Sequence, residues 1–388
     1  MSRDYDVVVL GVGGIGSGAC YWLSRRRGAR VLGLEQFELG HVRGGSHDHS
    51  RIIRLSYHTP KYVRLAQQAY GAWAALEKDA GESLIVKTGG LDFARPTSRI
   101  PLRDYFESLD ACAVPYERLD AAEIMRRWPA FRLPDDVVGL YQPDGGIAPA
   151  MKCTAAHVRM AREHGALVRD NAPVERIRAF GGEVEITAGG ETYRCRTLLI
   201  TAGAWTNGAL AHFGLKLPLT VTQEQVTYFS PPDLGPFQVG RFPMWIWMDE
   251  PCYYGFPVYG EAAVKATQDV GGDEVTTDTR TFDPNPAIEG RVRAFLEEYI
   301  PGAAGPVLYS KPCLYTMAPD RDFIVDHLPG HENVFLVVDS AHGFKFSSLL
   351  GRILSELATD GRTASDLSGF DYARPILHME NPPRSFMV

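Results

Sequence analysis

The chain has 388 residues, of which 45% are hydrophobic and 22% charged, an ordinary composition for a globular protein with two domains or one elaborated domain. The formal net charge of −7 at pH 7 argues against a nucleic-acid partner, and no apolar run is long enough to span a membrane. The six cysteines are scattered and form no C-x-x-C pair, so neither a disulfide framework nor a zinc site is expected. We therefore predict a cytoplasmic protein.

The first 35 residues have the pattern of a dinucleotide-binding unit. Residues 6–10 form a β-branched apolar run, residues 17–27 have helical spacing, and a second strand delivers Glu35 at its end. Between the first strand and the helix, G-x-G-x-x-G is formed by Gly11, Gly13, Gly14 and Gly16. Such glycines allow a tight turn, a close pyrophosphate and close helix packing, and the acid binds a ribose hydroxyl. The acid favours FAD or NAD over NADP; the alternative is a glycine turn in an unliganded α/β unit.

A loop rich in glycine and histidine follows between residues 37 and 50. Its three histidines and one aspartate suggest a metal site at first, but the spacing is loop-like and no cysteine or glutamate joins them, so no metal is expected. Next come Arg51 and Arg54, separated by two isoleucines, which we expect on one face of a helical turn. The two arginines are either a solvated edge or a fixed cation pair beside a cofactor and an anionic substrate.

The rest of the chain combines helical and strand patterns. Apolar spacing predicts helices at residues 62–78, 102–111, 121–128, 153–164 and 286–299, and a last helix that is capped by Ser347 or Ser348 and ends before Gly361. Predicted strands lie at 87–93, 166–168, 174–177, 183–186, 191–196, 197–201, 221–229, 244–248, 252–256, 262–267, 323–326 and 334–338. Residues 95–145 and 216–310 are expected to form a second domain.

Two turns of the first domain favour a flavin. The strand at 197–201 follows a predicted hairpin and ends in a small-residue turn at 202–205, which lets the backbone approach a cofactor and is usual in two-dinucleotide-binding-like flavoproteins. Lys345 stands at the start of the last helix, where its charge adds to the positive end of the helix dipole. This arrangement suits the anionic form of a reduced flavin, so we predict FAD.

Six short motifs in one order resemble the monomeric sarcosine oxidase and N-methyltryptophan oxidase family of flavoprotein amine oxidases. They are SRIIR at 50–54, KTGG at 87–90, TAGAW at 201–205, YYGFP at 253–257, CLYT at 313–316 and HGFKF at 342–346. The resemblance implies an α/β fold: a Rossmann-like FAD-binding domain with a second, substrate domain built on a mixed antiparallel sheet. It assigns residues 1–90, 149–215 and 319–388 to the FAD-binding domain and residues 91–148 and 216–318 to the substrate domain.

The resemblance also implies how the cofactor is held. In the family, FAD is attached covalently through its 8-methyl group to the cysteine that matches Cys313, and an arginine that matches Arg51 lies against the flavin. The other residues implied in cofactor binding, beyond the glycine motif and Glu35, are Ser46, His47, Ser50, Val174, Gly203, Trp205, Gly343, Phe344 and Lys345.

For catalysis, the resemblance makes Arg54 and Lys345 the pair that binds the substrate carboxylate. Lys265 would stand on the opposite face of the flavin, where it activates oxygen. Tyr254 and Tyr315 would line the substrate cavity. We count these five residues and Arg51 as the predicted catalytic group.

Two positions depart from the family pattern. Asp269 stands where close sarcosine oxidases carry a histidine, four residues after the lysine, and Trp245 takes a pocket position that usually holds methionine. Both are predicted to line the substrate pocket. An acidic, bulkier pocket argues against sarcosine itself more than against the reaction type.

The predicted function is oxidation of a secondary, N-methyl or N-alkyl amino acid to an imine, with O₂ reduced to H₂O₂ and the imine hydrolysed to amine and aldehyde. The expected partners are a small amino acid and O₂, and the protein is expected to be a monomer. Two rivals remain open. One is a FAD-dependent amino acid dehydrogenase or cyclic imino acid oxidase of the proline or pipecolate type, and the other is a nucleotide-binding regulatory protein without turnover.

Overall fold

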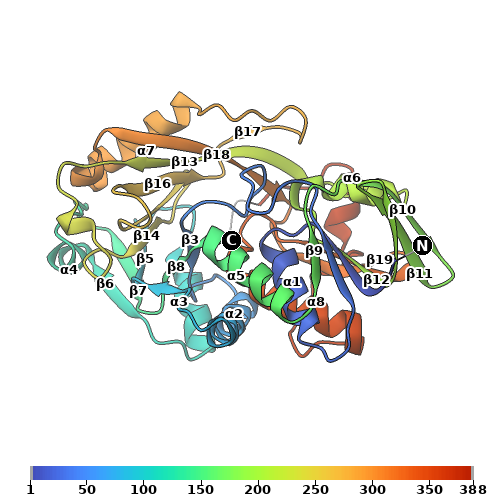
Figure 1. The fold of residues 1–388 in the computed structure, drawn as a ribbon. Coiled ribbons are helices and arrows are strands. Elements are labelled where there is room, and N and C mark those ends of the chain that lie inside the picture. Colours follow the sequence, from blue (N-terminus) through green and yellow to red (C-terminus); the bar gives the residue numbers. More distant parts are fainter. Residues whose placement is uncertain (1–2, 386–388) are drawn as a thin grey trace.

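The computed structural model describes residues 3–385, so the outermost residues of the first and last predicted segments, 1–2 and 386–388, lie outside the described range. An eight-stranded sheet takes its strands from three separate parts of the chain (Figure 1). Its strands are β1 (Arg3–Leu10), β2 (Val31–Leu34), β9 (Leu167–Arg169), β10 (Val174–Phe180), β11 (Glu183–Ala188), β12 (Glu191–Ile200), β19 (Ile324–Leu328) and β20 (His331–Val338). β1 runs parallel to β2 and β12, and β12 runs parallel to β20. This parallel centre is buried, as its continuous apolar runs predict.

A second sheet of nine strands is mostly antiparallel. Its strands are β5 (Gly90–Ala94), β6 (Glu117–Asp120), β7 (Val138–Gln142), β13 (Thr220–Phe229), β14 (Met244–Trp247), β15 (Cys252–Phe256), β16 (Val264–Asp269), β17 (Asp273–Glu274) and β18 (Val307–Met317). β14 is the exception, because it runs parallel to β5 and so joins the two parts of the chain that build this sheet. The α/β fold with a mixed antiparallel second sheet is as predicted.

A small sheet of β3 (Arg51–Ile53), β4 (Val86–Lys87) and β8 (Gly146–Ala148) completes the strands of the described chain. It pairs segments that the prediction assigns to different domains. The predicted division of the chain into five segments of FAD-binding and substrate domain therefore remains a proposal.

Eight α-helices occur in residues 3–385. They are α1 (Gly14–Ser24), α2 (Pro60–Ala80), α3 (Leu102–Ala111), α4 (Ala121–Arg127), α5 (Ala150–Glu163), α6 (Thr206–Ala211), α7 (Pro286–Tyr299) and α8 (Ser347–Asp360). In this part of the chain no helix has the length and apolarity to cross a membrane.

The crossing of α1 and α8 brings the two ends of the chain to one site. A Cβ added to Gly18 would lie 2.6 Å from the carbonyl oxygen of Ser347, and one added to Gly351 would lie 2.3 Å from the carbonyl carbon of Gly18. Only glycine allows so close an approach. The glycine-rich turn before α1 and the turn that carries Lys345 before α8 consequently open on the same cavity.

Three local predictions are wrong. Arg51 to Ile53 form a strand rather than a helical turn, since four residues with two central isoleucines fit either period and the pairing with β8 decides. Residues 191–200 form one strand instead of two, because β12 pairs with the β11 hairpin and with β1 along the same line. Neither Ser347 nor Ser348 caps α8, whose N-cap is Phe346, because the preceding turn already has helical backbone angles.

Candidate active site

One cavity extends from the carboxyl end of β1 to the inner face of the second sheet. Predicted cofactor residues that line its first part are Gly11, Gly13, Gly14, Glu35, Ser46, Arg51, Val174, Gly203 and Trp205. Predicted residues that line its other part are Arg54, Tyr254, Asp269, Tyr315 and Lys345, whereas the ring of Phe344 lies against Gly14 in the first part. We call the first part the nucleotide end and the second the substrate end. The sequence therefore identified most of a site whose members are spread over the chain.

The glycine motif shapes the nucleotide end. Gly11 has φ of +87°, and a Cβ on Gly16 would lie 1.8 Å from the carbonyl oxygen of Gly11, so strand, turn and helix fit only with glycine at both places. Gly16 therefore acts through packing and does not itself line the cavity. Ser46 reaches over the turn, and its hydroxyl accepts a 2.9 Å hydrogen bond from the Gly14 N–H.

Glu35 is a buried carboxylate at the end of β2. It accepts hydrogen bonds from the backbone N–H of Val12 at 2.9 Å and of Phe37 at 3.1 Å, and His41 lies 3.4 Å away. Burial alone would raise the pKa of Glu35, but His41 and the two N–H donors outweigh it and hold that pKa below its usual value. The carboxylate is thus ionised and fixed as an acceptor at the cavity wall.

A cluster of charges, centred on Asp48, lies beside the cavity between its two ends. Lys265 places its Nζ 2.7 Å from one carboxylate oxygen of Asp48, and the Arg51 guanidinium lies 3.7 Å from the same oxygen. The other oxygen accepts a 2.8 Å hydrogen bond from the Tyr228 hydroxyl. Asp48 has φ of +87°, an unusual angle for a residue with a side chain. We call this group the Asp48 cluster; the sequence analysis did not assign Asp48 a role.

Lys265 does not line the cavity. Its ammonium lies behind the loop that does, and it donates a 2.7 Å hydrogen bond to the Ser50 carbonyl. Burial lowers the pKa of Lys265 to about 8, although Asp48 acts to raise it. Ser50 likewise lies behind the wall, as a backbone acceptor for both Lys265 and Arg51. The chain thus keeps a titratable ammonium close to the cavity but screened from bulk water.

His47 and Cys313 are also buried next to the cavity instead of lining it. Burial lowers the pKa of His47 to about 3, and neither ring nitrogen has a hydrogen-bond partner. Burial raises the pKa of the Cys313 thiol to about 11, with Arg51 opposing this effect. The next residues of β18, from Leu314 to Thr316, do line the cavity. Gly343, also behind the wall, allows a tight turn, since a Cβ there would lie 2.2 Å from the Cβ of Asp339.

Arg54 and Lys345 lie in the substrate end of the cavity. Arg54 places its Nη1 3.4 Å from Asp92, a buried carboxylate that the sequence analysis did not single out. Lys345 donates a 2.9 Å hydrogen bond to the carbonyl of His342, and Trp73 fixes its backbone carbonyl. Burial, with a smaller contribution from Arg54, lowers the pKa of Lys345 to about 7. Arg54 therefore has a carboxylate counter-ion in the free protein, whereas Lys345 is held by a neutral carbonyl.

Asp269 has partners that correct one prediction. The Tyr315 hydroxyl, which lies 3.3 Å from that of Tyr254, donates to Asp269 at 3.3 Å, and Arg321 places its Nη1 3.2 Å from the other carboxylate oxygen. Arg321 also lines the cavity and is almost fully buried. The pocket is thus not simply acidic, because this arginine balances the carboxylate. No sequence pattern pointed to Arg321, which lies 52 residues from Asp269 along the chain.

Trp245 does not belong to the cavity, so its predicted pocket place is wrong. Its ring stacks on Phe295 of α7, with ring centroids 5.5 Å apart, in the core on the far side of the second sheet. Successive side chains of a strand face opposite sides. Ile246 and Met248, one position away on either side of Trp247, are therefore the residues of this segment that line the cavity.

Comparisons with known proteins agree with this site. Residues 6–357 match the family model described as FAD dependent oxidoreductase. A glycine turn, a buried acid at the end of β2 and a cavity that continues to a second sheet are the features such a protein requires. The protein is therefore a FAD-dependent oxidoreductase.

Full-length relatives narrow the class. The chain is 32% identical over 384 residues to a monomeric sarcosine oxidase of Arthrobacter sp., covering 97% of this chain and 98% of that one. It is also 32% identical to an N-methyl-L-tryptophan oxidase of Salmonella arizonae, covering 95% and 99%. The chain belongs to the monomeric sarcosine oxidase and N-methyltryptophan oxidase family, which are flavin amine oxidases acting on CH–NH bonds.

Solved structures share the fold over the whole chain. NikD, described as an unusual amino acid oxidase essential for nikkomycin biosynthesis, matches with a TM-score of 0.85 at 27% identity over 100% of this chain and 99% of that chain. An L-proline dehydrogenase from P. horikoshii matches with the same TM-score of 0.85 at 19% identity over 96% of this chain and 97% of that one. The second likeness is one of fold alone.

The residues present fit FAD. A Cβ on Gly14 would lie 2.9 Å from the Phe344 ring and one on Gly13 would lie 3.1 Å from the Ser46 hydroxyl, so bare backbone at the start of α1 forms part of the cavity wall. The N-cap of α1 is Gly13, which has no side chain to cap the helix, so apart from the Gly14 N–H that Ser46 binds, the N-terminus is available for a pyrophosphate. The ionised Glu35 lies where a ribose hydroxyl can donate to it.

Proposed function

We propose that the protein oxidises a secondary amino acid at its carbon–nitrogen bond, with O₂ as the final electron acceptor. The observation that carries this proposal is that Arg54 and Lys345, from opposite ends of the chain, line the cavity that begins at the nucleotide-binding turn. Two cations at this place are more than nucleotide binding requires, which argues against a regulatory protein without turnover. The named relatives act on N-methylated amino acids, so N-methyl and N-alkyl amino acids are the first substrates to test.

The chain's own residues would bind and orient the substrate. Arg54 would bind the substrate carboxylate through the guanidinium N–H groups that do not face Asp92, and Lys345 would contribute a second positive charge. FAD, when bound, would supply the acceptor for a hydride from the substrate carbon, that is for two electrons and one proton. The substrate nitrogen has to be unprotonated for this transfer, so the Tyr254 and Tyr315 hydroxyls are suited to hold it as a neutral amine.

Lys265 and Arg51 are the residues proposed for oxygen reduction. Both are cations, both are bound to Asp48, and Lys265 has a pKa that burial lowers to about 8, so its ammonium is a usable proton donor near neutral pH. Reduction of O₂ to H₂O₂ uses two electrons and two protons, and the lysine would supply one proton. The competing proposal is a dehydrogenase that passes its electrons to a carrier, as the printed name of the P. horikoshii protein states for that enzyme.

Covalent attachment of FAD at Cys313 is a separate proposal. The thiol is buried beside the cavity, and Arg51 and Lys265 both favour its thiolate, although burial keeps its pKa at about 11. Attachment therefore requires that the bound cofactor lower this pKa further than Arg51 and Lys265 already do. In Cys313→Ala, FAD should be released by acid denaturation, whereas in the wild type it should stay with the precipitated chain. Freely extractable flavin from the wild type would exclude attachment.

The function is tested by a screen with the purified holoprotein. Sarcosine, N-methyltryptophan, proline, pipecolate and larger N-alkyl amino acids should each be added without oxygen while the flavin absorbance is followed, and then with oxygen while peroxide is measured. Bleaching without oxygen and one peroxide per substrate in air are expected for at least one N-alkyl amino acid. Bleaching without peroxide would favour the dehydrogenase, bleaching with proline or pipecolate alone would favour a cyclic imino acid oxidase, and no bleaching at all would overturn the proposal.

A further inference from the structure

The loop between β18 and β19 carries Arg321 into the cavity in an unusual backbone conformation. Arg321 has φ of +58°, a region that residues with a side chain rarely adopt. Its side chain is 2% exposed and ends 3.2 Å from Asp269 of β16. A strained residue persists only where its surroundings hold it, and such residues concentrate at functional sites.

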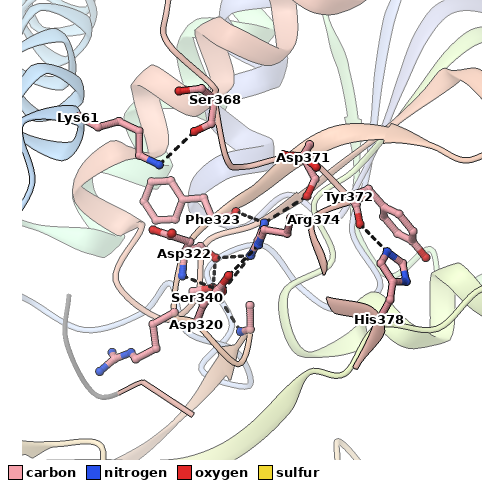
Figure 2. A network of polar contacts seen from close by, with 12 residues as sticks. Lys61, Asp320, Asp322, Phe323, Ser340, Ser368, Asp371, Tyr372, Arg374 and His378 are labelled. Atoms are coloured by element: carbon pink, nitrogen blue, oxygen red, sulfur yellow. Dashed lines mark hydrogen bonds and ion pairs between the residues drawn. The ribbon is translucent and has the colours of Figure 1, made fainter. Parts of the chain in front are cut away.

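A network of polar contacts centred on Arg374 holds this loop from outside (Figure 2). The Arg374 guanidinium binds both carboxylate oxygens of Asp320, at 2.8 and 3.0 Å, and donates to the carbonyls of Asp322 at 3.2 Å and Phe323 at 2.8 Å. The residues immediately before and after Arg321 are thus fixed by one bidentate arginine. Figure 2 shows that Arg374 reaches them from the C-terminal segment, which also carries Tyr372 and His378.

A second set of contacts joins the Arg321 loop to the turn before Lys345. The Ser340 hydroxyl donates to the Asp322 carbonyl at 2.7 Å and accepts from the Ala318 N–H at 3.3 Å. His342 lies 2.9 Å from the Arg321 carbonyl through its Nε2, and its own carbonyl accepts from Lys345. The positions of Arg321 and Lys345 in the cavity are therefore fixed relative to each other.

The charge of Asp269 explains why Arg321 is held so firmly in the cavity. Asp269 lines the same cavity as Arg54 and Lys345, so an uncompensated carboxylate there would repel the substrate carboxylate that those two cations bind. Arg54 already has Asp92 as its partner, and Asp269 in turn has Arg321. Asp92 and Asp269 are thereby both neutralised, while Lys345 donates its hydrogen bond to a carbonyl and is influenced by the charges of Asp269 and Asp339 without an ion pair to either.

We propose that Arg321 is a specificity-determining residue that neutralises Asp269, so that the cavity accepts an amino acid with one carboxylate and an uncharged side chain, and that Arg374 is the positioning residue that holds Arg321 in place. This inference rests on the proposed function for the identity of the substrate as an amino acid. It predicts that the Arg321–Asp269 pair governs which charges the cavity accepts, and not merely how stable the fold is.

The test uses binding of acetate and malonate to the holoprotein, read from the flavin absorption spectrum and from the shift in melting temperature, so that no turnover is needed. Arg321→Met should weaken acetate binding by about tenfold or more, because Asp269 is then unbalanced. Asp269→Asn should improve malonate binding relative to acetate binding, because loss of this carboxylate adds one net positive charge to the cavity. The double variant R321M/D269N should bind acetate within about threefold of the wild type, since the two changes act on one pair.

Arg374→Gln should weaken acetate binding in the same direction as Arg321→Met but less, and Asp320→Asn should do the same if Arg374→Gln fails to fold. Arg194→Gln is a matched control, because it removes an arginine–carboxylate pair with Glu185 in the β11–β12 hairpin, away from the cavity. The proposal is overturned if the single variants lower the melting temperature but leave the acetate-to-malonate ratio unchanged, or if the double variant binds acetate as weakly as Arg321→Met. Failure of the wild type to bind either anion would also overturn it. Selective binding without turnover of any N-alkyl amino acid would instead overturn only the proposed function.

Discussion

The Asp48 cluster and the substrate end of the cavity distribute similar charges in opposite ways. In the Asp48 cluster one carboxylate serves Arg51 and Lys265, and Lys311 approaches it to 4.0 Å from the surface. At the substrate end each arginine has its own carboxylate, as Arg54 has Asp92 and Arg321 has Asp269. The first arrangement keeps a surplus of positive charge beside the proposed flavin, and the second nearly cancels its charges.

This difference matches the two tasks proposed for the cavity. A reduced flavin and a partly reduced oxygen both carry negative charge, so a surplus of fixed cations stabilises them without reorganisation. The cavity needs enough positive charge to bind the substrate carboxylate, but it must also release the product. The ammonium of Lys345 suits both needs, because its lowered pKa allows it to lose its charge. Each of the two regions also contains a buried, unprotonated histidine: His47 beside the Asp48 cluster and His342 at the substrate end.

The largest effect on the comparison of these two regions is expected from Asp48→Ala. It leaves Arg51 and Lys265 buried without the carboxylate that both bind, and loss of one partner from a buried ion pair costs about 3–5 kcal/mol. Urea denaturation should show a fall in the free energy of unfolding of this size. Tyr228→Phe, which removes only a hydrogen bond to Asp48, is the control and should cost about 1 kcal/mol. Equal effects of the two variants would show that Asp48 is not the common counter-ion.

Lys265→Met distinguishes the function of the Asp48 cluster from that of the substrate end. Reoxidation of the reduced flavin by O₂ should slow on the order of 100-fold, because one preorganised charge is lost from the Asp48 cluster. Anaerobic reduction by substrate should change by no more than a few fold, since Lys265 does not line the substrate end. Stopped-flow absorbance measures both half-reactions. Equal slowing of the two would place Lys265 in substrate binding and remove the distinction.

The adjustable charge of Lys345 predicts a pH dependence of carboxylate binding. Its pKa is lowered to about 7 in the free chain, and a bound carboxylate favours the charged form. Acetate should therefore bind fully below pH 7, and its Kd should rise by up to about tenfold per pH unit above that. Arg54 has a raised pKa and stays charged throughout. Lys345→Met should bind acetate more weakly and without this dependence, and a flat wild-type profile between pH 6 and 9 would contradict the assignment.

The two buried histidines predict equal acid sensitivity of the Asp48 cluster and of the substrate end. Burial lowers the pKa of His47 to about 3 and that of His342 well below its usual value, so each is neutral when folded but takes up a proton near pH 6.5 when unfolded. Because the folded pKa is the lower one, stability is complete above about pH 6.5 and is lost as the pH falls, at about 1.4 kcal/mol per unit for each histidine. Urea titrations between pH 7.5 and 5 measure how the free energy of unfolding depends on pH. His47→Gln and His342→Gln should each reduce this slope by about 1.4 kcal/mol per pH unit, which is what one histidine contributes. A change in only one of the variants would show that the Asp48 cluster and the substrate end differ in acid sensitivity as well.

Much of the fold and of the cavity was predictable because its signals are local. The glycine motif with Glu35, the boundaries of α3 and α7, and the cap at Gly361 follow from spacing and residue type over a few turns of chain. Arg54, Lys345, Tyr254 and Tyr315 were identified because they belong to short motifs, and all four line the cavity. The misread segment, Arg51 to Ile53, is too short for its period to be decisive.

By itself, the sequence determined where backbone turns, helices and buried strands occur, because steric and apolar patterns act between near neighbours. Only the tertiary structure decided which carboxylate balances which cation: Asp48 in the loop before β3 meets Lys265 of β16, Arg54 meets Asp92, and Arg321 meets Asp269. It also decided that Trp245 turns away from the cavity while its neighbours face it. The geometry of a strand requires that adjacent side chains face opposite sides of the sheet. Which of the two sides faces the cavity depends on how the rest of the chain folds around the sheet.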